Sequence, residues 1–217
     1  LPLKGAELAL GTVLFIFLYS SALLYEHATV GIANEFFINV GSIGSYDLEF
    51  GWVVDGLSIM MYFVVGTVSS LVFVYATNYM QGEIRYTFFF TSLTLFAGSM
   101  LVLVSSPTLL QLLIGWELVG VCSYLLIGHY WEKKENSSAA MKAFITNKIA
   151  DIGLMIGIIV LALSTKTLRI SEILYQSTHD YEDIKTVAYL GGVLLFIGAM
   201  GKSAQFPLHV WLPDAMA

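Results

Sequence analysis

Six long apolar segments constrain this chain more than any other feature of its sequence. They lie at about residues 6–25, 54–76, 86–104, 108–128, 139–163 and 184–204. Each approaches the roughly 20 residues that an α-helix needs to cross a bilayer. Backbone groups in lipid must be satisfied within the spanning element, and barrel strands would be about half as long and alternate in polarity. The sequence therefore predicts an all-α, polytopic transmembrane helical bundle with about six spans.

The composition agrees with a membrane protein. Hydrophobic residues make up 57% of the 217 residues and charged residues only 12%, which is more apolar surface than an ordinary soluble domain of this length can bury. The apolar composition therefore predicts the lipid bilayer as a partner. The sixteen acidic and ten basic residues are spread over loops and spans and are too few for a nucleic-acid-binding patch, so we predict no nucleic acid. The chain begins at Leu1 and ends within "DAMA", so we expect it to be a piece of a longer polypeptide.

The loop at residues 26–53 indicates the orientation of the bundle. It contains four acidic residues and no Lys or Arg, which is typical of an outward-facing loop. Within it "FFINV" and "YDLEF" flank "GSIGS", a pattern that predicts a small β-hairpin on the outer surface. Alternating the spans from this loop places five basic residues inside (Lys4, Arg85, Lys133, Lys134 and Lys142) and three outside (Lys166, Arg169 and Lys185).

Two local signals occur in the fifth span. Ser137 and Ser138 precede its apolar run, and either hydroxyl is a suitable N-cap for the helix. Gly153 and Gly157 form a GxxxG pair, which lets a neighbouring helix approach closely.

Four ionisable residues lie within the apolar spans: Glu117, Lys148, Asp151 and Lys202. An isolated charge at the centre of a spanning helix costs about 2.5–3.5 kcal/mol on insertion scales. Four such residues are therefore expected to face one another or water. Glu117 has about nine apolar-dominated residues on either side and is the strongest candidate for proton exchange. Burial raises the pKa of a carboxyl group and a nearby ammonium lowers it, so the two together can set a carboxylate to take up and release a proton. A static ion pair that sets helix register is the structural alternative.

The other three charges differ in what they predict. Lys148 and Asp151 are three residues apart, share a helix face and can pair with each other, and Lys148 is also near enough to the inner end to extend toward the interface. Lys202 is followed by Pro207, which deprives the carbonyl of Ser203 of its helical partner. We therefore expect the last span to be discontinuous just after Lys202, as in helices that border ion pathways.

No motif for a cofactor is present. The single cysteine, Cys122, predicts a small packed residue, and there is no P-loop, GxGxxG motif or cysteine cluster. His129 adjoins Tyr130 and Trp131 at an inner span end, which is typical of an interfacial belt. We predict no metal and no cofactor bound by this chain.

Three motifs carry a resemblance to a known family. The segments "GWELVGVCSYLLIGHYW", "AAMKAFITNKIADIGL" and "GKSAQFPLHVWLPDAMA" resemble, in order and spacing, the antiporter-like subunit of respiratory complex I, called subunit L in bacteria and subunit 5 in mitochondria. "VDGLSIMM" opens the second span in the manner of that family. By this resemblance, residues 1–217 form the N-terminal part of a proton-translocating antiporter-like membrane domain that continues beyond Ala217.

The resemblance implies a function and a set of site residues. The family's fifth-helix glutamate and seventh-helix lysine fall on Glu117 and Lys202, its sixth-helix acid falls on Asp151, and Lys148 occupies a position filled by Arg or Lys. The implied activity is proton translocation coupled to electron transfer from NADH to quinone, by a non-redox subunit of the translocase. We hypothesise that Glu117 and Lys202 form an ion pair that opens and closes as protons load and leave, with Asp151 modulating it.

The resemblance also implies where the cofactors and partners lie. NADH, FMN, iron–sulfur clusters and quinone would belong to other subunits, and the partners would be other membrane-arm subunits of complex I and protons. The membrane would be the bacterial plasma membrane, the mitochondrial inner membrane or the thylakoid.

Several alternatives stay open on sequence alone. The large subunit of a multisubunit Na⁺/H⁺ antiporter shares this helical core. Related subunits also serve ferredoxin-linked photosynthetic complexes, membrane-bound hydrogenases and inorganic-carbon uptake systems. A structural membrane subunit without a proton path of its own is an alternative of a different class.

Overall fold

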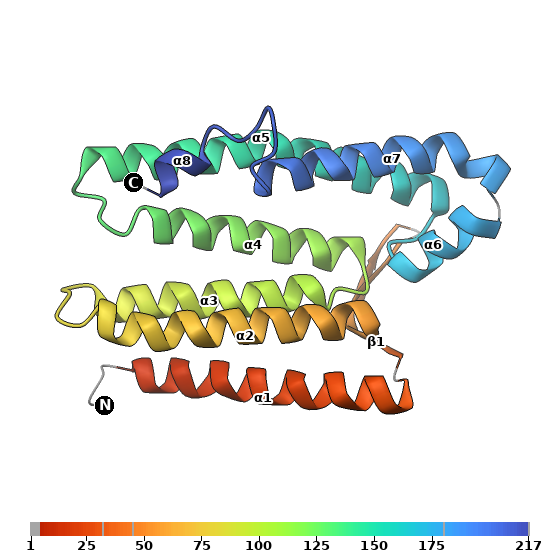
Figure 1. Ribbon diagram of the computed structural model, residues 1–217. Helices are drawn as coiled ribbons and strands as arrows, with labels where there is room; N and C mark the ends of the chain where they lie inside the picture. Colours follow the sequence, from red (N-terminus) through yellow and green to blue (C-terminus); the bar gives the residue numbers. More distant parts are fainter. Residues whose placement is uncertain (1–4, 32, 45, 180, 217) are drawn as a thin grey trace.

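The fold is a bundle of long helices with one β-hairpin at its end (Figure 1). The computed structural model describes residues 5–31, 33–44, 46–179 and 181–216. Within these ranges the elements are α1 (Ala6–Val30), β1 (Asn34–Ile43), β2 (Tyr46–Val54), α2 (Gly56–Tyr79), α3 (Tyr86–Val104), α4 (Leu109–Ile127), α5 (Lys134–Thr165), α6 (Ile170–His179), α7 (Tyr181–Lys202) and α8 (Leu212–Ala215).

Six of the described helices are long and apolar enough to cross a membrane: α1, α2, α3, α4, α5 and the part of α7 from Ile184 to Lys202. The predicted six spans are therefore confirmed. They lie side by side in Figure 1, with the hairpin and α6 at one end of the bundle, which we call the hairpin end. The loops after α2 and α4 lie at the opposite end, which we call the loop end.

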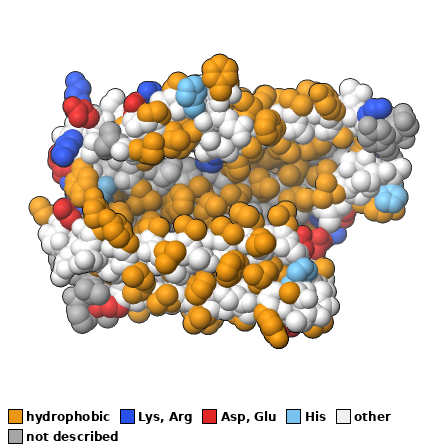
Figure 2. Space-filling model, viewed as in Figure 1, with side chains coloured by type: hydrophobic (Ala, Val, Ile, Leu, Met, Phe, Trp, Pro, Cys, Tyr) orange, Lys and Arg blue, Asp and Glu red, His pale blue; other side chains and the backbone are white. Residues whose placement is uncertain are grey.

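The outer surface of the bundle is that of a protein embedded in lipid. Large hydrophobic side chains are exposed along the spans, for example Leu18 on α1 and Leu71 on α2, which are 66% and 67% exposed. Figure 2 shows hydrophobic side chains over the sides of the bundle, with charged side chains mostly toward the two ends. The positions of the basic residues agree with the alternation of spans, apart from Lys4, which lies outside the described residues.

The β-hairpin predicted in the first loop is confirmed. β1 and β2 pair antiparallel, with Ile43 opposite Tyr46 next to the turn and Asn34 opposite Val54 at the open end. Gly44 in the turn has φ 63°, a left-handed conformation that glycine adopts without strain. Phe36 and Trp52 are cross-strand partners, and their stacked rings have centroids 5.9 Å apart. Aromatic pairs of this kind stabilise a two-stranded sheet.

Polar contacts fasten the hairpin to the helices. Arg169, just before α6, donates two hydrogen bonds to the Glu49 carboxylate of β2, at 2.5 and 2.6 Å. Gln111 on α4 accepts a hydrogen bond from the Gly51 N–H and donates one to the Gly51 carbonyl. Thr108, the N-cap of α4, donates to the Glu49 carbonyl. The hairpin is therefore held on the N-terminus of α4, which carries Glu117 farther along.

The Glu49–Arg169 pair supports a prediction about stability. The hydrogen bonds that the Glu49 carboxylate accepts from Arg169 hold the pKa of Glu49 below the ordinary value of 4.5. A carboxylate with a lowered pKa stabilises the fold above its ordinary pKa and loses that contribution as the pH falls. We expect Glu49→Gln to lower the free energy of unfolding by about 2 kcal/mol near neutral pH, with the difference from wild type shrinking below about pH 4.5. Thermal unfolding of the full-length subunit in detergent measures both effects.

The matched control for this prediction is Glu172→Gln. Glu172 also pairs with Arg169, but by one bond of 3.1 Å, and its side chain is 45% exposed. Because exposed pairs contribute little, we expect a loss of under about 1 kcal/mol. An equal loss for both variants, or a Glu49→Gln effect independent of pH, would contradict a specific Glu49–Arg169 clamp.

Glycines bring α5 and α7 into close contact. A Cβ added at Gly157 of α5 would lie 3.0 Å from the Gly191 carbonyl oxygen of α7, and one added at Gly153 would lie 3.0 Å from the Ile197 side chain. The GxxxG pair therefore faces a neighbouring helix, as predicted. The approach continues to Gly201, where a Cβ would lie 2.3 Å from that of Ala150. Close packing at Gly201 positions the adjacent Lys202 against α5.

The predicted break in the last span is confirmed. α7 ends at Lys202, and the chain continues irregularly to the four-residue helix α8. Ala204 adopts a left-handed φ of 49°, which ends the helical path. The Trp211 indole N–H donates to the Gly201 carbonyl at 3.0 Å, and Lys142 of α5 pairs with Asp214 of α8 at 2.6 Å. These contacts hold the segment after the break against α5, between the end of α7 and the loop end of the bundle (Figure 1).

Two local expectations differ from the structure. The N-cap of α5 is Lys133, and no side chain caps that end, so the prediction of Ser137 or Ser138 as the cap is wrong. The polar segment "KENSS" is instead the start of α5, so the helix extends beyond its apolar run. The short helix α6 was also not predicted, since it is too short to give an apolar run of spanning length.

Candidate functional site

The four intramembrane charges come from three helices that pack together. Glu117 lies on α4, Lys148 and Asp151 on α5, and Lys202 at the end of α7. We call these four residues the charged cluster. Their formal charges sum to zero, which removes most of the cost of placing single charges in a span.

Glu117 and Lys148 form an ion pair between α4 and α5. The Lys148 ammonium also lies 3.8 Å from a carboxylate oxygen of Asp151, one turn along α5. Asp151 is 2% exposed, whereas the Glu117 and Lys148 side chains are 28% and 37% exposed. Lys148 is therefore shared between two carboxylates, one buried within the bundle and one nearer its surface.

Trp116 joins Asp151 to Lys202. Its indole N–H donates a 2.6 Å hydrogen bond to Asp151, and its ring lies beneath the Lys202 ammonium, 5.3 Å from nitrogen to ring centroid. Such a cation–π contact stabilises a charge that is removed from water. Among the described residues, Lys202 has no carboxylate within 4.0 Å.

Gly120 gives Lys202 access to the surface of α4. A Cβ at this position would lie 2.9 Å from the Lys202 ammonium nitrogen, so a larger residue would displace that nitrogen. Gly120 is one turn beyond Trp116, and the two residues therefore line the same face of α4. Together they define where the lysine of the broken helix contacts the bundle.

The expected direct pair between Glu117 and Lys202 is not formed in this structure. Lys148 binds Glu117 instead, and Lys202 contacts Trp116. The Lys148 ammonium lies between Glu117 and Asp151 and not at the end of the span. The pairing of Lys148 with Asp151 agrees with their spacing in the sequence.

Trp116 and Gly120 are site residues that the sequence interpretation missed. One signal was present: an indole N–H needs an acceptor when it is removed from water, and Trp116 stands directly before an intramembrane glutamate. No comparable signal marks Gly120, since only the position of Lys202 shows why a side chain is excluded there.

The charged cluster consists of carboxylates and ammonium groups, which are groups that gain and lose protons. In the described ranges there is no group of three or more His, Cys, Asp and Glu side chains that could hold a metal ion. An iron–sulfur cluster needs about four thiolates, while Cys122 is the only cysteine of the sequence and is buried. The residues of this chain do not fit such a cluster.

The chain is similar to known families and to individual relatives. Residues 106–217 match the family "NADH:quinone oxidoreductase/Mrp antiporter, TM", and residues 41–90 match "NADH-Ubiquinone oxidoreductase (complex I), chain 5 N-terminus". Chain 5 of the NAD(P)H-quinone oxidoreductase of Synechocystis is 44% identical over 200 residues, which cover 91% of this chain and 29% of that protein. The chloroplastic subunit 5 of Zygnema circumcarinatum is 42% identical over 218 residues, covering 99% and 31%.

Two solved structures share the fold. An archaeal membrane-bound sulfane sulfur reductase matches with a TM-score of 0.79 at 18% identity, over 97% of this chain and 42% of the other. The Mrp complex from Dietzia matches with a TM-score of 0.78 at 24% identity, over 97% and 25%. The chain spans about three tenths of the length of the curated relatives named above. It is an integral, multi-pass membrane protein, and it belongs to the NADH:quinone oxidoreductase/Mrp antiporter transmembrane family.

Proposed function

We propose that this chain is the N-terminal part of an antiporter-like subunit that translocates protons within an NAD(P)H–quinone oxidoreductase complex. The curated relatives carry the name of that enzyme's subunit or chain 5, which supports the choice of complex. The observation that carries the proposal is the charged cluster: two acids and two lysines from three helices, linked through Trp116 within the spans.

The cluster moves protons by exchanging partners. When Glu117 takes up a proton it no longer holds Lys148, whose ammonium then has Asp151 as its nearest carboxylate, at 3.8 Å. At an effective dielectric constant of about 20, two charges at about 4 Å interact by about 4 kcal/mol. Stronger pairing of Lys148 with Asp151 weakens the pull of Asp151 on Lys202. Lys202, which is held by a ring and not by a carboxylate, then releases its proton without first breaking an ion pair.

This role is a non-redox one within the larger assembly. The chain offers carboxylates, ammonium groups and an indole in its spans, which exchange or orient protons but carry no electrons. NADH, FMN, iron–sulfur clusters and quinone are accordingly assigned to other subunits. The exposed apolar sides of the spans provide surface for lipid and for neighbouring membrane subunits.

Glu117→Gln in the complete complex tests the proposal. We expect proton uptake per quinone reduced to fall about fivefold, because glutamine cannot take up a proton. The loss is partial because Asp151 remains as a second proton acceptor. Sealed vesicles with a pH-sensitive dye give proton uptake, and quinone reduction by NAD(P)H is followed in parallel. Glu172→Gln, at the hairpin end, is the matched control and should retain the wild-type ratio. Unchanged coupling in Glu117→Gln would refute the charge-exchange mechanism.

Sodium/proton exchange is the second candidate function. The family match includes Mrp antiporters, and the Mrp complex from Dietzia shares the fold. The same vesicles distinguish the two functions. Proton uptake that depends on quinone reduction and persists without Na⁺ supports the oxidoreductase assignment, whereas uptake that requires a Na⁺ gradient supports the antiporter.

A further inference from the structure

A buried histidine lies just beyond the loop end of α4. His129 is two residues past Ile127, the last residue of the helix, and is 4% exposed. Its Nδ1 atom is buried and has no hydrogen-bond partner among the described residues. An exposed belt residue would keep such an atom in bulk water, so burial without a partner marks a place for a small polar ligand.

A cavity adjoins this histidine. It has a volume of about 210 Å³, and its walls include His129, Met80, Phe89, Asn136 and Asp214. Since one water occupies about 30 Å³ in the liquid, the cavity has room for several. Water is therefore the ligand that fits the free Nδ1 atom.

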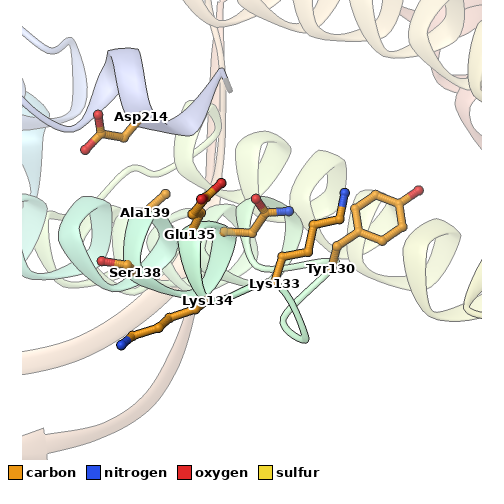
Figure 3. Close-up of a pocket in the computed structure, with 8 residues that line it drawn as sticks. Tyr130, Lys133, Lys134, Glu135, Ser138, Ala139 and Asp214 are labelled. Atoms are coloured by element: carbon orange, nitrogen blue, oxygen red, sulfur yellow. The ribbon is translucent and has the colours of Figure 1, made fainter.

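A second pocket adjoins this cavity at the loop end. This wider pocket of about 810 Å³ shares four wall residues with the cavity, namely Tyr130, Asn136, Ala139 and Asp214. Figure 3 shows this pocket, with Lys133, Lys134 and Glu135 around it and Asp214 facing it from the segment after the broken helix. By the charge bias of the loops, this is the inner face of the membrane.

The surroundings of His129 suit proton transfer. Burial and the Arg85 guanidinium, which donates to the His129 carbonyl, lower the pKa of His129, while Glu83 and Glu132 act in the opposite direction. The lowered pKa leaves a neutral imidazole near pH 7, and its two nitrogens then act as one donor and one acceptor. On the α3 side the ring contacts Phe88 and Phe89, on its own loop it contacts Tyr130, and Asp214 lies across the cavity.

A second unpartnered polar atom lies between the cavity and the charged cluster. Asn147 on α5 is 6% exposed, and its Oδ1 atom has no hydrogen-bond partner among the described residues. It lies beside Gly201, 3.6 Å from the position of a Cβ there. From Ala139 at the cavity to Lys148 is about 14 Å along α5, a distance that about five hydrogen-bonded waters span.

We propose that His129 is a proton-uptake residue that passes protons from the loop-end pocket, by way of water near Asn147, to the charged cluster. This inference rests on the proposed function. A hydronium ion in the cavity gives its extra proton to the unprotonated ring nitrogen and becomes water, and the imidazolium then gives a proton to the next water inward, which becomes hydronium. The neutral imidazole is restored, so one proton is moved and nothing is oxidised or reduced.

His129→Phe in the complete complex tests this role while keeping an aromatic ring among Phe88 and Phe89. We expect proton uptake per quinone reduced to fall about tenfold, which is less than the roughly hundredfold or more for a positioned acid–base group because bulk water partly replaces the imidazole. Added imidazole should restore part of the lost uptake, because it can enter the adjoining cavity of about 210 Å³ and exchange protons there. A structural role would not respond to imidazole. His129→Gln, which retains a polar side chain but cannot be protonated, serves if the Phe variant fails to assemble, and the same loss is expected.

His179→Phe is the matched control. His179 lies in α6 at the hairpin end, stacked on Tyr175, and its replacement should leave uptake within about twofold of wild type. Glu117→Gln measured alongside separates the two ideas. Reduced uptake in Glu117→Gln with normal uptake in assembled His129→Phe or His129→Gln would overturn the role of His129 alone. Normal uptake in all of these variants would overturn the proposed function together with this inference.

Discussion

Replacing Lys202 with alanine is expected to reduce proton uptake by the complete complex to the background of vesicles without it, a loss of at least about twentyfold. Lys202 is the one cluster member supplied by the broken helix, and its ammonium contacts α4 at Trp116 and Gly120. Among the described residues, no other amine contacts Trp116 or Gly120 to take its proton. Dye-detected proton uptake and quinone reduction, measured in the same vesicles, give the result.

Lys202→Arg distinguishes a proton carrier from a fixed charge. Arginine keeps the positive charge and the cation–π contact but does not deprotonate in proteins. A carrier role therefore predicts that the arginine variant also loses proton uptake, whereas a purely structural charge predicts retention. Lys185→Ala, a replacement of an exposed lysine on the same helix, is the control and should behave as wild type. Wild-type uptake in both Lys202 variants would exclude Lys202 from the path.

Adding one methyl group at Gly201 is expected to destabilise the bundle by about 3 kcal/mol. The Cβ of alanine at this position would lie 2.3 Å from the Ala150 Cβ, far inside van der Waals contact. Both atoms are fixed to helix backbones, so α5 and α7 must separate and Lys202 must move with them. Thermal unfolding of the full-length subunit in detergent gives the loss of stability, and proton uptake should fall in the same variant.

A second substitution should relieve this clash. Ala150→Gly removes the opposing Cβ, so the double variant with Gly201→Ala should recover at least about half of the lost stability. Gly192→Ala is the control on the same helix, because no atom lies within 4 Å of a Cβ there. Destabilisation by Gly201→Ala that Ala150→Gly fails to relieve would show that the α5–α7 contact is not the cause.

The sequence predicted which residues make up the candidate site better than it predicted which of them contact one another. The sequence identified the four residues of the charged cluster, because a charge within an apolar span is energetically costly and indicates a partner or a function. The i, i+3 spacing of Lys148 and Asp151 predicted their pairing, since it places both on one helix face. Spacing along one helix says nothing about which residue of another helix is opposite, so the Glu117–Lys148 pair and the role of Trp116 were missed.

His129 shows the same limit at the end of a span. Its neighbours Tyr130 and Trp131 are typical of an interfacial belt, and no feature of the sequence indicates that the ring is buried. Burial comes from Phe88 and Phe89 of α3 and from the fold of the segment that brings Asp214 alongside. These contacts join residues far apart in the chain.

The sequence by itself determined the number of spans, the hairpin in the first loop and the break after Lys202. Each depends on local properties: the length of an apolar run, the turn residues between two strands, and the missing N–H of Pro207. Only the tertiary structure decided which charges meet and which polar atoms lack a partner. The spans are apolar around most of their circumference, so no polar stripe specifies how each helix is rotated. Close packing at Gly153, Gly157 and Gly201 sets that rotation for α5 and α7, and it places Lys202 over Trp116.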